Sequence, residues 1–336
     1  METDPDLAAL LGVLQRAAKV FGAATVAEAV PRRKAIVFVN QAAGVAEAAS
    51  VDEAAAQRAV EALKRVAELV KEGIFPSGDA LPSPADLLAL ERCIRFMRPS
   101  LLIQDGALPE GPAIALTGEQ KAAIDRVIGG VGAIGRPFER VGIATGFLVG
   151  PRALVTNIHV VDQLAGVGGT LPRGEAVVRF GLEWDRLDLA DPIAIKGELA
   201  RHPSQDLVVL ELEADAPLGC VLPLAAAPTL AVGQPILVVG YPADDRRCAA
   251  WAKLMFENKY RVKRASPGAV MGLALGRLLH DASTLGGSSG SPVFDCESGA
   301  VVGIHAEGVF ALENRAVPSF AVWASEEVRR HVTSWV

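Results

Sequence analysis

Aromatic side chains are scarce in this sequence, at 5% of 336 residues. Hydrophobic residues nevertheless make up 51% of the chain and charged residues 21%, close to the values of an ordinary globular protein. Valine, leucine, isoleucine and alanine must therefore fill its cores. The length is sufficient for two or three compact units.

Long apolar runs and paired cysteines are also missing. No uninterrupted apolar run reaches the roughly 18 residues of a membrane helix. The N-terminal residues Met1–Asp6 are acidic where a secretory leader is basic. The four cysteines show neither C-x-x-C pairs nor metal-ligand spacing; they are Cys93, Cys220, Cys248 and Cys296. We therefore expect a cytoplasmic protein with reduced cysteines, no bound metal and no membrane contact.

The net charge of −6 and the pI near 5.5 argue against a general nucleic-acid binder. One basic run, interrupted only by Glu257, stands out against this background. It comprises Arg246, Arg247, Lys253, Lys259, Arg261, Lys263 and Arg264. The run has the charge to hold an acidic substrate or a nucleic acid, but a solvated strand-and-loop face is the preferred interpretation.

Residues 1–112 have the pattern of a mostly helical domain. Ser50 and Glu53 form a capping-box pattern before an apolar repeat of helical spacing. Further helices are expected over 7–20 and 83–98, and a short strand over 35–39. Pro109–Pro112 resembles a linker, so a shortened chain that starts near Gly111 is expected to fold alone; if it does not, these helices complete a barrel core. None of these residues has catalytic spacing.

The pattern then becomes β-rich. A second capping box at Thr117–Gln120 predicts a helix through Ile128, which Gly129–Gly130 end. Short runs of β-forming residues follow at 144–149, 153–156, 207–212, 235–240 and 301–304. Because turn residues separate them at short intervals, they indicate β-barrels rather than alternating βαβ units. A short helix is expected over 325–332.

The stretch Ser283–Asp295 has the clearest functional signal, with three glycines and four serines between apolar segments. A flexible linker is one interpretation. Acyl transfer is another, because a serine on a glycine-rich turn has a hydroxyl nucleophile beside inward-facing backbone N–H groups. The sequence Gly286-x-Ser288-x-Gly290 also fits the nucleophile elbow of α/β-hydrolases. That fold requires a helix and several βα units after the serine, whereas Pro292 follows and only 47 residues remain after Ser289.

A histidine and an aspartate precede Ser289 in the order that a serine peptidase requires. His159 lies where the β-forming run 153–156 gives way to a turn. Asp206 comes 47 residues after His159 and directly before the β-forming run 207–212. Ser289 follows 83 residues after Asp206. Each residue alone is more often structural, but together they indicate a catalytic triad.

These segments resemble the chymotrypsin-like serine peptidases in their bacterial form, the glutamyl endopeptidases and HtrA proteases. The resemblance covers about residues 116–336. It is carried by four segments, namely Gly146–Val149 with Thr156–Val161, Asp206–Leu210, Gly240–Pro242 and Gly287–Pro292. The residue before the serine is Ser288, where the family more often has Asn or Asp.

The resemblance implies two six-stranded antiparallel β-barrels with a C-terminal helix, a mainly β fold preceded by the helical domain. The barrels would span 113–222, with His159 and Asp206, and 223–336, with Ser289. Ser289 would attack the scissile carbonyl, His159 would transfer the proton, and Asp206 would fix the imidazole. The N–H groups of Gly287 and Ser289 would form the oxyanion hole. No cofactor is needed.

Three features depart from the family. Val160 and Leu285 stand where secreted animal enzymes have disulfide cysteines, which suits a reducing compartment. Arg126–Gly130 resembles a zymogen activation site, but Ser288 has no charge to pair with a new N-terminus. The segment is therefore better explained as a helix end. No room remains after the barrels for the PDZ domain of HtrA.

The leading hypothesis is a serine endopeptidase that acts on proteins or peptides. Residues 1–112 would serve as a regulatory or adaptor domain that docks a protein partner. The alternative is a catalytically inactive protease fold that serves as a peptide-binding or scaffold protein. The presence of all three triad residues disfavours this alternative.

The expected specificity residues are Ser283, Thr284, His305 and Glu307. Ser283 takes the place of the aspartate of trypsin-like enzymes, which argues against a Lys or Arg preference. Thr284 and His305 resemble the carboxylate-binding pair of glutamyl endopeptidases, although His305 also fits a buried strand residue. We expect cleavage after Glu, or after small residues if the acid Glu307 dominates the pocket rim.

Overall fold

The computed structural model describes residues 99–110, 114, 116–139, 142–166, 169–187, 191–216, 220–244, 256–309 and 313–336. The chain divides into two compact units, one of residues 1–99 with 246–257 and one of residues 100–245 with 258–336. Nearly all described residues belong to the second unit. The helices and the strand expected before residue 98 lie outside the described residues, so the helical domain over 1–112 stays a prediction.

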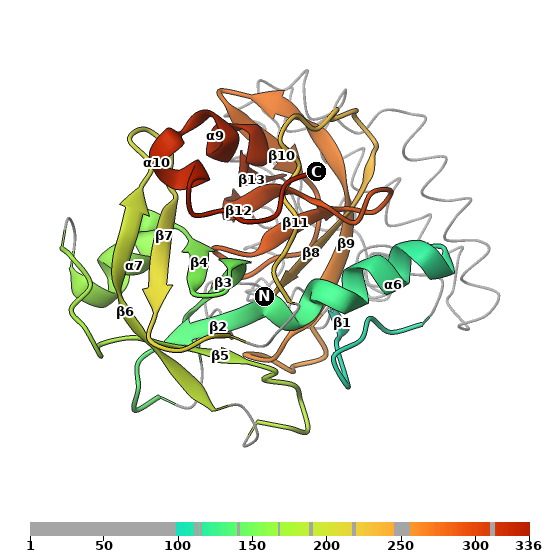
Figure 1. Ribbon diagram of the computed structural model, residues 1–336. Coiled ribbons are helices and arrows are strands. Elements are labelled where there is room, and N and C mark those ends of the chain that lie inside the picture. Colours follow the sequence, from blue (N-terminus) through green and yellow to red (C-terminus); the bar gives the residue numbers. More distant parts are fainter. Residues whose placement is uncertain are drawn as a thin grey trace, which may run out of the picture. The chain divides into compact units, whose positions relative to one another are not determined.

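The first barrel is closed and antiparallel, with the strand order β2-β3-β4-β7-β6-β5 (Figure 1). Its strands are β2 (Val131–Gly135), β3 (Ala144–Gly150), β4 (Ala153–Thr156), β5 (Val177–Phe180), β6 (Pro192–Arg201) and β7 (Val208–Leu212). Strands β3, β4 and β7 form where valine and leucine runs predicted them. Their residues are almost all buried, because closure of the barrel covers one face and neighbouring elements cover the other.

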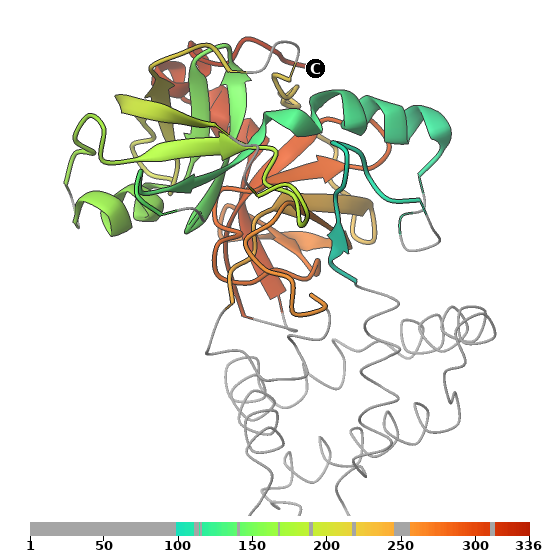
Figure 2. The ribbon, with the colours of Figure 1, turned by 90° about the horizontal axis from the view of Figure 1, so that it is seen from below.

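The second barrel closes through β8, β9, β10, β13, β12 and β11, since β8 pairs with both β9 and β11. Its strands are β8 (Pro235–Gly240), β9 (Arg264–Ala274), β10 (Arg277–His280), β11 (Pro292–Asp295), β12 (Val301–Val309) and β13 (Glu313–Pro318). Strand β1 (Leu101–Leu102) adds to β9 at its first residues (Figure 2). The mainly β fold with two six-stranded barrels is therefore confirmed.

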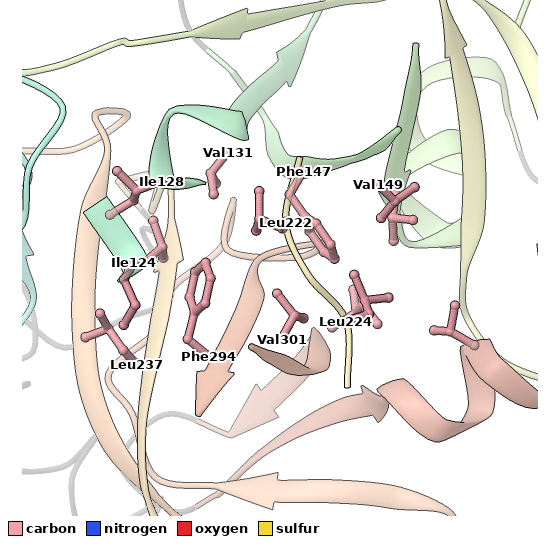
Figure 3. Close-up of a cluster of buried hydrophobic side chains, with 14 of the residues drawn as sticks. Ile124, Ile128, Val131, Phe147, Val149, Leu222, Leu224, Leu237, Phe294 and Val301 are labelled. Atoms are coloured by element: carbon pink, nitrogen blue, oxygen red, sulfur yellow. The ribbon is translucent and has the colours of Figure 1, made fainter. Parts of the chain in front are cut away.

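The largest hydrophobic cluster joins side chains of both barrels (Figure 3). Phe147 of β3 and Phe294 of β11 are fully buried in it, together with Leu222 and Leu224 of the segment that connects the barrels. Two smaller clusters fill the separate barrel interiors. Burial of an aromatic side chain stabilises the fold by about 1.5–3 kcal/mol, so this shared cluster fixes one barrel against the other.

Short helices flank the barrels. Helix α6 (Gly118–Val127) begins with the predicted capping box, in which Thr117 and Gln120 exchange hydrogen bonds of 2.8 and 3.3 Å. A 3-10 turn, η2 (Ile128–Gly130), ends it as expected. At the C-terminus two helices, α9 (Ser319–Ala324) and α10 (Glu326–Arg329), replace the single helix expected over 325–332. No helix among the described residues has the length and apolar character to cross a membrane.

Part of the basic run is not a solvated face, which corrects the sequence interpretation. Lys263 and Arg264 are each 1% exposed. Lys263 Nζ donates to the carbonyl oxygen of Ile128 at 3.1 Å, and Arg264 Nε donates to that of Ser100 at 3.0 Å. Backbone carbonyls therefore satisfy these buried cations. The remaining described bases of the run are Lys259 and Arg261, and the others lie outside the described residues.

Candidate active site

His159 lies in the first turn of helix α7 (Ile158–Ala165), directly after strand β4. Thr156 at the end of β4 pairs with Val208 of β7 in an antiparallel register, which places Asp206 opposite the first residues of α7. Asn157, which is fully buried, donates from Nδ2 to the backbone oxygen of Asp206 at 2.8 Å. The β4–β7 pairing therefore brings together two residues that lie 47 positions apart.

The carboxylate of Asp206 contacts His159 with both oxygens. Oδ2 lies 2.6 Å from His159 Nδ1, and Oδ1 accepts the backbone N–H of His159 at 3.0 Å. Burial favours the neutral acid and raises the pKa of Asp206, but hydrogen bonds and charge from His159 outweigh it and lower that pKa. Because the carboxylate is ionised, it accepts a hydrogen bond from Nδ1, so the neutral imidazole carries its proton on Nδ1. Nε2 is then free of a proton and can act as a base.

Ser289 lies in the turn between β10 and β11, held by its backbone to both barrels. Its carbonyl oxygen accepts from the N–H of Thr145 in β3 at 2.9 Å, and the next N–H, of Gly290, donates to His305 of β12 at 2.8 Å. Its Oγ donates to the carbonyl oxygen of Ala306 at 3.2 Å. Ser289 and His159, both within the described residues, form no hydrogen bond with each other.

The turn before Ser289 leaves two N–H groups unused. Neither Gly287 N–H nor Ser289 N–H donates a hydrogen bond to any residue that the structure describes. Gly286 O accepts from Ala243 N at 2.5 Å, and this trans peptide directs the N–H of Gly287 to the opposite side. Gly287 has φ +90°, and a Cβ there would lie 2.5 Å from the carbonyl oxygen of Tyr241. Only glycine fits this position.

The four expected specificity residues do not form one cluster of hydrogen bonds. Thr284, 8% exposed, donates from Oγ1 to Asn314 Oδ1 at 2.7 Å. His305, 3% exposed, contacts His280 of β10, with 3.2 Å between His305 Nδ1 and His280 Nε2. Glu307 is exposed and forms an ion pair of 3.6 Å with Arg315. Ser283 is buried at the start of the same turn.

Comparison with known proteins agrees with this geometry. Residues 144–304 match the model of the trypsin-like peptidase domain. A glutamyl endopeptidase of Staphylococcus aureus is 30% identical over 182 residues, which are 52% of this chain and 45% of the relative. Residues 144–304 are therefore similar to a trypsin-like peptidase domain. The resemblance inferred from the sequence motifs is thereby confirmed, although the chain spans less than half the length of the curated relatives it matches.

Solved structures of serine proteases are also among the proteins similar to this chain. A serine endoprotease from Yersinia pestis has a TM-score of 0.46 at 16% identity, over 66% of this chain and 68% of that chain. Neuropsin, a serine protease expressed in the limbic system of mouse brain, has a TM-score of 0.44 at 18% identity, over 57% of this chain and 90% of that chain.

Burial controls the charge of the pair formed by His280 and His305. It lowers the pKa of His305 to about 3, with a smaller contribution from the charge of His159. Burial, with the neighbouring His305, also lowers the pKa of His280 well below the usual range. Both imidazoles are therefore neutral near pH 7, so His305 carries no positive charge there in the absence of a bound carboxylate. A bound carboxylate would favour the protonated form and raise the pKa of His305.

Several residues of this site were not singled out from the sequence. Asn314 links Thr284 to the backbone, because its Nδ2 also donates to the carbonyl oxygen of Ala282 at 2.7 Å. His280 and Thr145 are both fully buried polar residues within strands. A polar residue inside a β-forming run is a weak signal of such a role. For His280 and Asn314 this signal was not recognised, because the short strands that contain them were not predicted from the sequence.

Proposed function

We propose that this protein is a serine endopeptidase that cleaves peptide bonds through Ser289, His159 and Asp206. The double contact between Asp206 and His159 is the observation that carries the proposal, because it prepares Nε2 of His159 to accept a proton. Ser289 is held by Thr145 on strand β3, which neighbours β4, the strand that leads to His159. This arrangement supports proton transfer from Ser289 to His159 once the hydroxyl turns.

The first half of the reaction forms an acyl-enzyme. Ser289 Oγ leaves the carbonyl oxygen of Ala306 by rotation about its Cα–Cβ bond, a motion of picoseconds to nanoseconds in exposed side chains. It then attacks the substrate carbonyl carbon while His159 Nε2 takes its proton. The N–H groups of Gly287 and Ser289 stabilise the oxyanion. Collapse of the tetrahedral intermediate breaks the C–N bond, and His159 gives its proton to the leaving amine.

Water completes the reaction by the same steps in reverse order. His159 removes a proton from water, the hydroxide adds to the ester carbon, and the oxyanion again faces the two N–H groups. The C–O bond to Ser289 then breaks, and the proton on His159 returns to Oγ. Asp206 remains ionised throughout and stabilises each imidazolium.

Labelling with a fluorophosphonate probe tests the proposal. The full chain is expected to label, and Ser289→Ala is expected to lose labelling and peptide hydrolysis while it keeps its fold. Ser204→Ala, a change at an exposed serine two residues before Asp206, is the matched control and should label like wild type. Equal labelling of wild type and Ser289→Ala would refute the assignment of Ser289.

An inactive, peptide-binding protein is the second candidate. The contact between Ser289 Oγ and Ala306 favours it, because this hydroxyl is directed to a carbonyl oxygen and not to the base. Such a protein would bind peptides in the same place but would fail to react with the probe. Peptide binding without labelling would support this candidate over the enzyme.

We propose cleavage after glutamate, with small residues as the second choice. Thr284 and His305 are the donors for a substrate carboxylate, and no acid occupies position 283. Glu307 opposes an acidic side chain less than the sequence suggests, because it is exposed and paired with Arg315. The similarity to a glutamyl endopeptidase of Staphylococcus aureus agrees with this preference.

Two further proposals concern the rest of the chain. Of residues 1–112, which the sequence assigned to a helical domain, those before β1 are proposed to form that domain, dock a protein partner and regulate the peptidase. The protein is proposed to act in a reducing compartment such as the cytoplasm. In support, the sequence has Val160 and Leu285 at the two positions where secreted animal enzymes have disulfide cysteines.

A further inference from the structure

Thr145 is a fully buried residue of strand β3 whose polar groups all contact the active-site turn or the strand before His159. Its hydroxyl donates to the carbonyl oxygen of Gly287 at 2.8 Å and accepts from the N–H of Tyr241 at 3.0 Å. Its own N–H donates to Ser289 at 2.9 Å, and its carbonyl oxygen accepts from Thr156 Oγ1 at 2.8 Å. Four segments of the chain therefore meet at one side chain and its peptide groups.

The hydroxyl fixes the orientation of the glycine turn. The turn is held on one side where Ala243 N–H binds Gly286 O, and on the other where Thr145 binds Gly287 O. Gly287 has φ +90° and no side chain, and glycine adopts many backbone conformations with similar ease. The backbone preference of Gly287 therefore does not by itself keep the peptide groups of the turn in their observed orientation. Hydrogen bonds must do so. The N–H of Ser288 closes the turn on the carbonyl oxygen of Leu285 at 3.0 Å, and of the two bonds to the adjacent carbonyls of Gly286 and Gly287 only the one from Thr145 comes from a side chain.

The same residue ties this turn to the strand that leads to the base. Thr156, which donates to the Thr145 carbonyl, ends β4 three residues before His159. The packing here is tight, since a Cβ on Gly290 would lie 2.0 Å from Thr145 O and 2.4 Å from Thr156 Oγ1. A displacement of the turn relative to β4 would therefore meet steric resistance.

We propose that Thr145 is a positioning residue whose hydroxyl holds the Gly287–Ser289 N–H groups in the orientation that receives the substrate oxyanion. The inference rests on the proposed peptidase function. Without the hydroxyl, Gly287 O and Tyr241 N–H lose a buried partner, and the peptide between Gly287 and Ser288 keeps only the bond from Ser288 N–H to Leu285 O. It can then tilt, together with the adjoining peptides that carry the N–H groups of Gly287 and Ser289. The N–H groups then point away from the developing charge, so the loss falls on the chemical step and not on substrate binding.

Three variants of the full chain test this role on one peptide substrate. Thr145→Val keeps the shape but removes the hydroxyl, and Thr145→Ser restores it. Thr333→Val removes a comparable hydrogen bond, from Thr333 Oγ1 to Val149 O at 3.1 Å, outside the site. Removal of an oxyanion donor costs roughly 10²–10³ in rate, so a misdirected donor should lower kcat by about 10–100-fold. We expect this loss in Thr145→Val, with KM within about twofold of wild type.

Two of these variants are controls, and the same measurements define the results that would contradict the proposal. Thr145→Ser should recover kcat to within about threefold, and Thr333→Val should keep wild-type kcat. Binding of a peptide aldehyde, which forms an oxyanion, should weaken in Thr145→Val, while binding of the matching peptide alcohol should not. An unchanged kcat in Thr145→Val, or a folded Thr145→Ser without recovery, would overturn the inference.

Two further results of this experiment are possible, namely that Thr145→Val does not fold and that wild type does not label. If Thr145→Val does not fold, Thr145→Cys replaces it, because a thiol is a weaker donor of similar size and should give an intermediate kcat; a wild-type kcat in Thr145→Cys would count against the role. If wild type shows no Ser289-dependent labelling, the proposed function fails and this inference fails with it. A failure restricted to the Thr145 variants leaves the peptidase assignment intact.

Discussion

Asp206 binds His159 through two different groups, the ring Nδ1 at 2.6 Å and the backbone N–H at 3.0 Å. The second contact locks the carboxylate plane to the first turn of α7. The aspartate is therefore positioned by the backbone before it acts on the ring. The pairing of β4 with β7 makes this relationship a property of the first barrel alone.

Asp206→Asn should retain the geometry but reverse the hydrogen-bond pattern at Nδ1. The amide group donates where the carboxylate accepted, which favours the wrong imidazole tautomer and is expected to cost about 10⁴ in kcat. Steady-state hydrolysis of a peptide substrate measures this. Asp215→Asn, which removes an exposed partner of Arg152, is the control and should stay within about twofold. Near-wild-type kcat in Asp206→Asn would remove this residue from the mechanism.

The rate of hydrolysis should rise with pH through one transition between about pH 5 and 8, because the base must be deprotonated to accept the proton of Ser289. The lowered pKa of Asp206 keeps its carboxylate ionised across this range. The pKa of His305, about 3, and that of His280, also lowered, exclude both from this transition. His159 is then the assigned base. A profile of kcat/KM that is flat between about pH 5 and 8 would contradict the assignment.

Preference for glutamate should strengthen as the pH falls. Without substrate, His305 is neutral above about pH 3, and a substrate carboxylate raises its pKa, so binding of glutamate takes up a proton. The ratio of kcat/KM for otherwise identical Glu and Gln peptides should therefore increase from pH 8 to 5.5. His305→Asn should flatten this dependence. A peptide library cleaved only after Arg or Lys would falsify the proposed preference.

Lys263 should make the stability of the protein depend on alkaline pH. Burial lowers its pKa to about 8 from 10.5. Between these values the unfolded chain binds more protons than the folded chain, so the free energy of unfolding rises with pH across this window. At 1.36 kcal/mol per unit the gain is at most about 3 kcal/mol. Denaturant midpoints from pH 7.5 to 10.5 should show this rise in wild type but not in Lys263→Met; parallel curves would contradict it.

Truncation should be tolerated at residue 99 but not at residue 111, contrary to the start near Gly111 that the linker pattern in the sequence predicted. Arg264, 1% exposed, donates from Nε and Nη2 to the carbonyl oxygen of Ser100, and β1 pairs with β9. A chain that starts at Gly111 lacks both contacts and leaves a buried guanidinium short of partners, which costs several kcal/mol. We expect residues 99–336 to be soluble and to melt well above residues 111–336. Equal melting temperatures would show that this segment is dispensable.

The sequence by itself determined the parts of the fold in which local and global preferences agree. Strands β4 and β8 begin and end where their valine and leucine runs do, and the capping box starts α6 at Gly118. The order of His159, Asp206 and Ser289 and the motifs around them carried the resemblance to a known family that implied the fold and the chemistry. These features depend on neighbours in the chain and can be recognised without coordinates.

Only the tertiary structure decided the contacts between distant segments. Strand β9 contains Pro267 and two glycines, and β13 begins with Glu313-Asn314-Arg315, so neither has strong β propensity; each forms because a neighbouring strand supplies its hydrogen bonds. The orientation of Ser289 Oγ toward Ala306, the neutral His280–His305 pair and the hold of Thr145 on Gly287 follow from barrel closure. Lys263 and Arg264, two bases of a run expected to be solvated, are buried and donate hydrogen bonds to backbone carbonyls. Local sequence cannot specify these relationships, because each depends on which groups closure brings within hydrogen-bond distance and away from water.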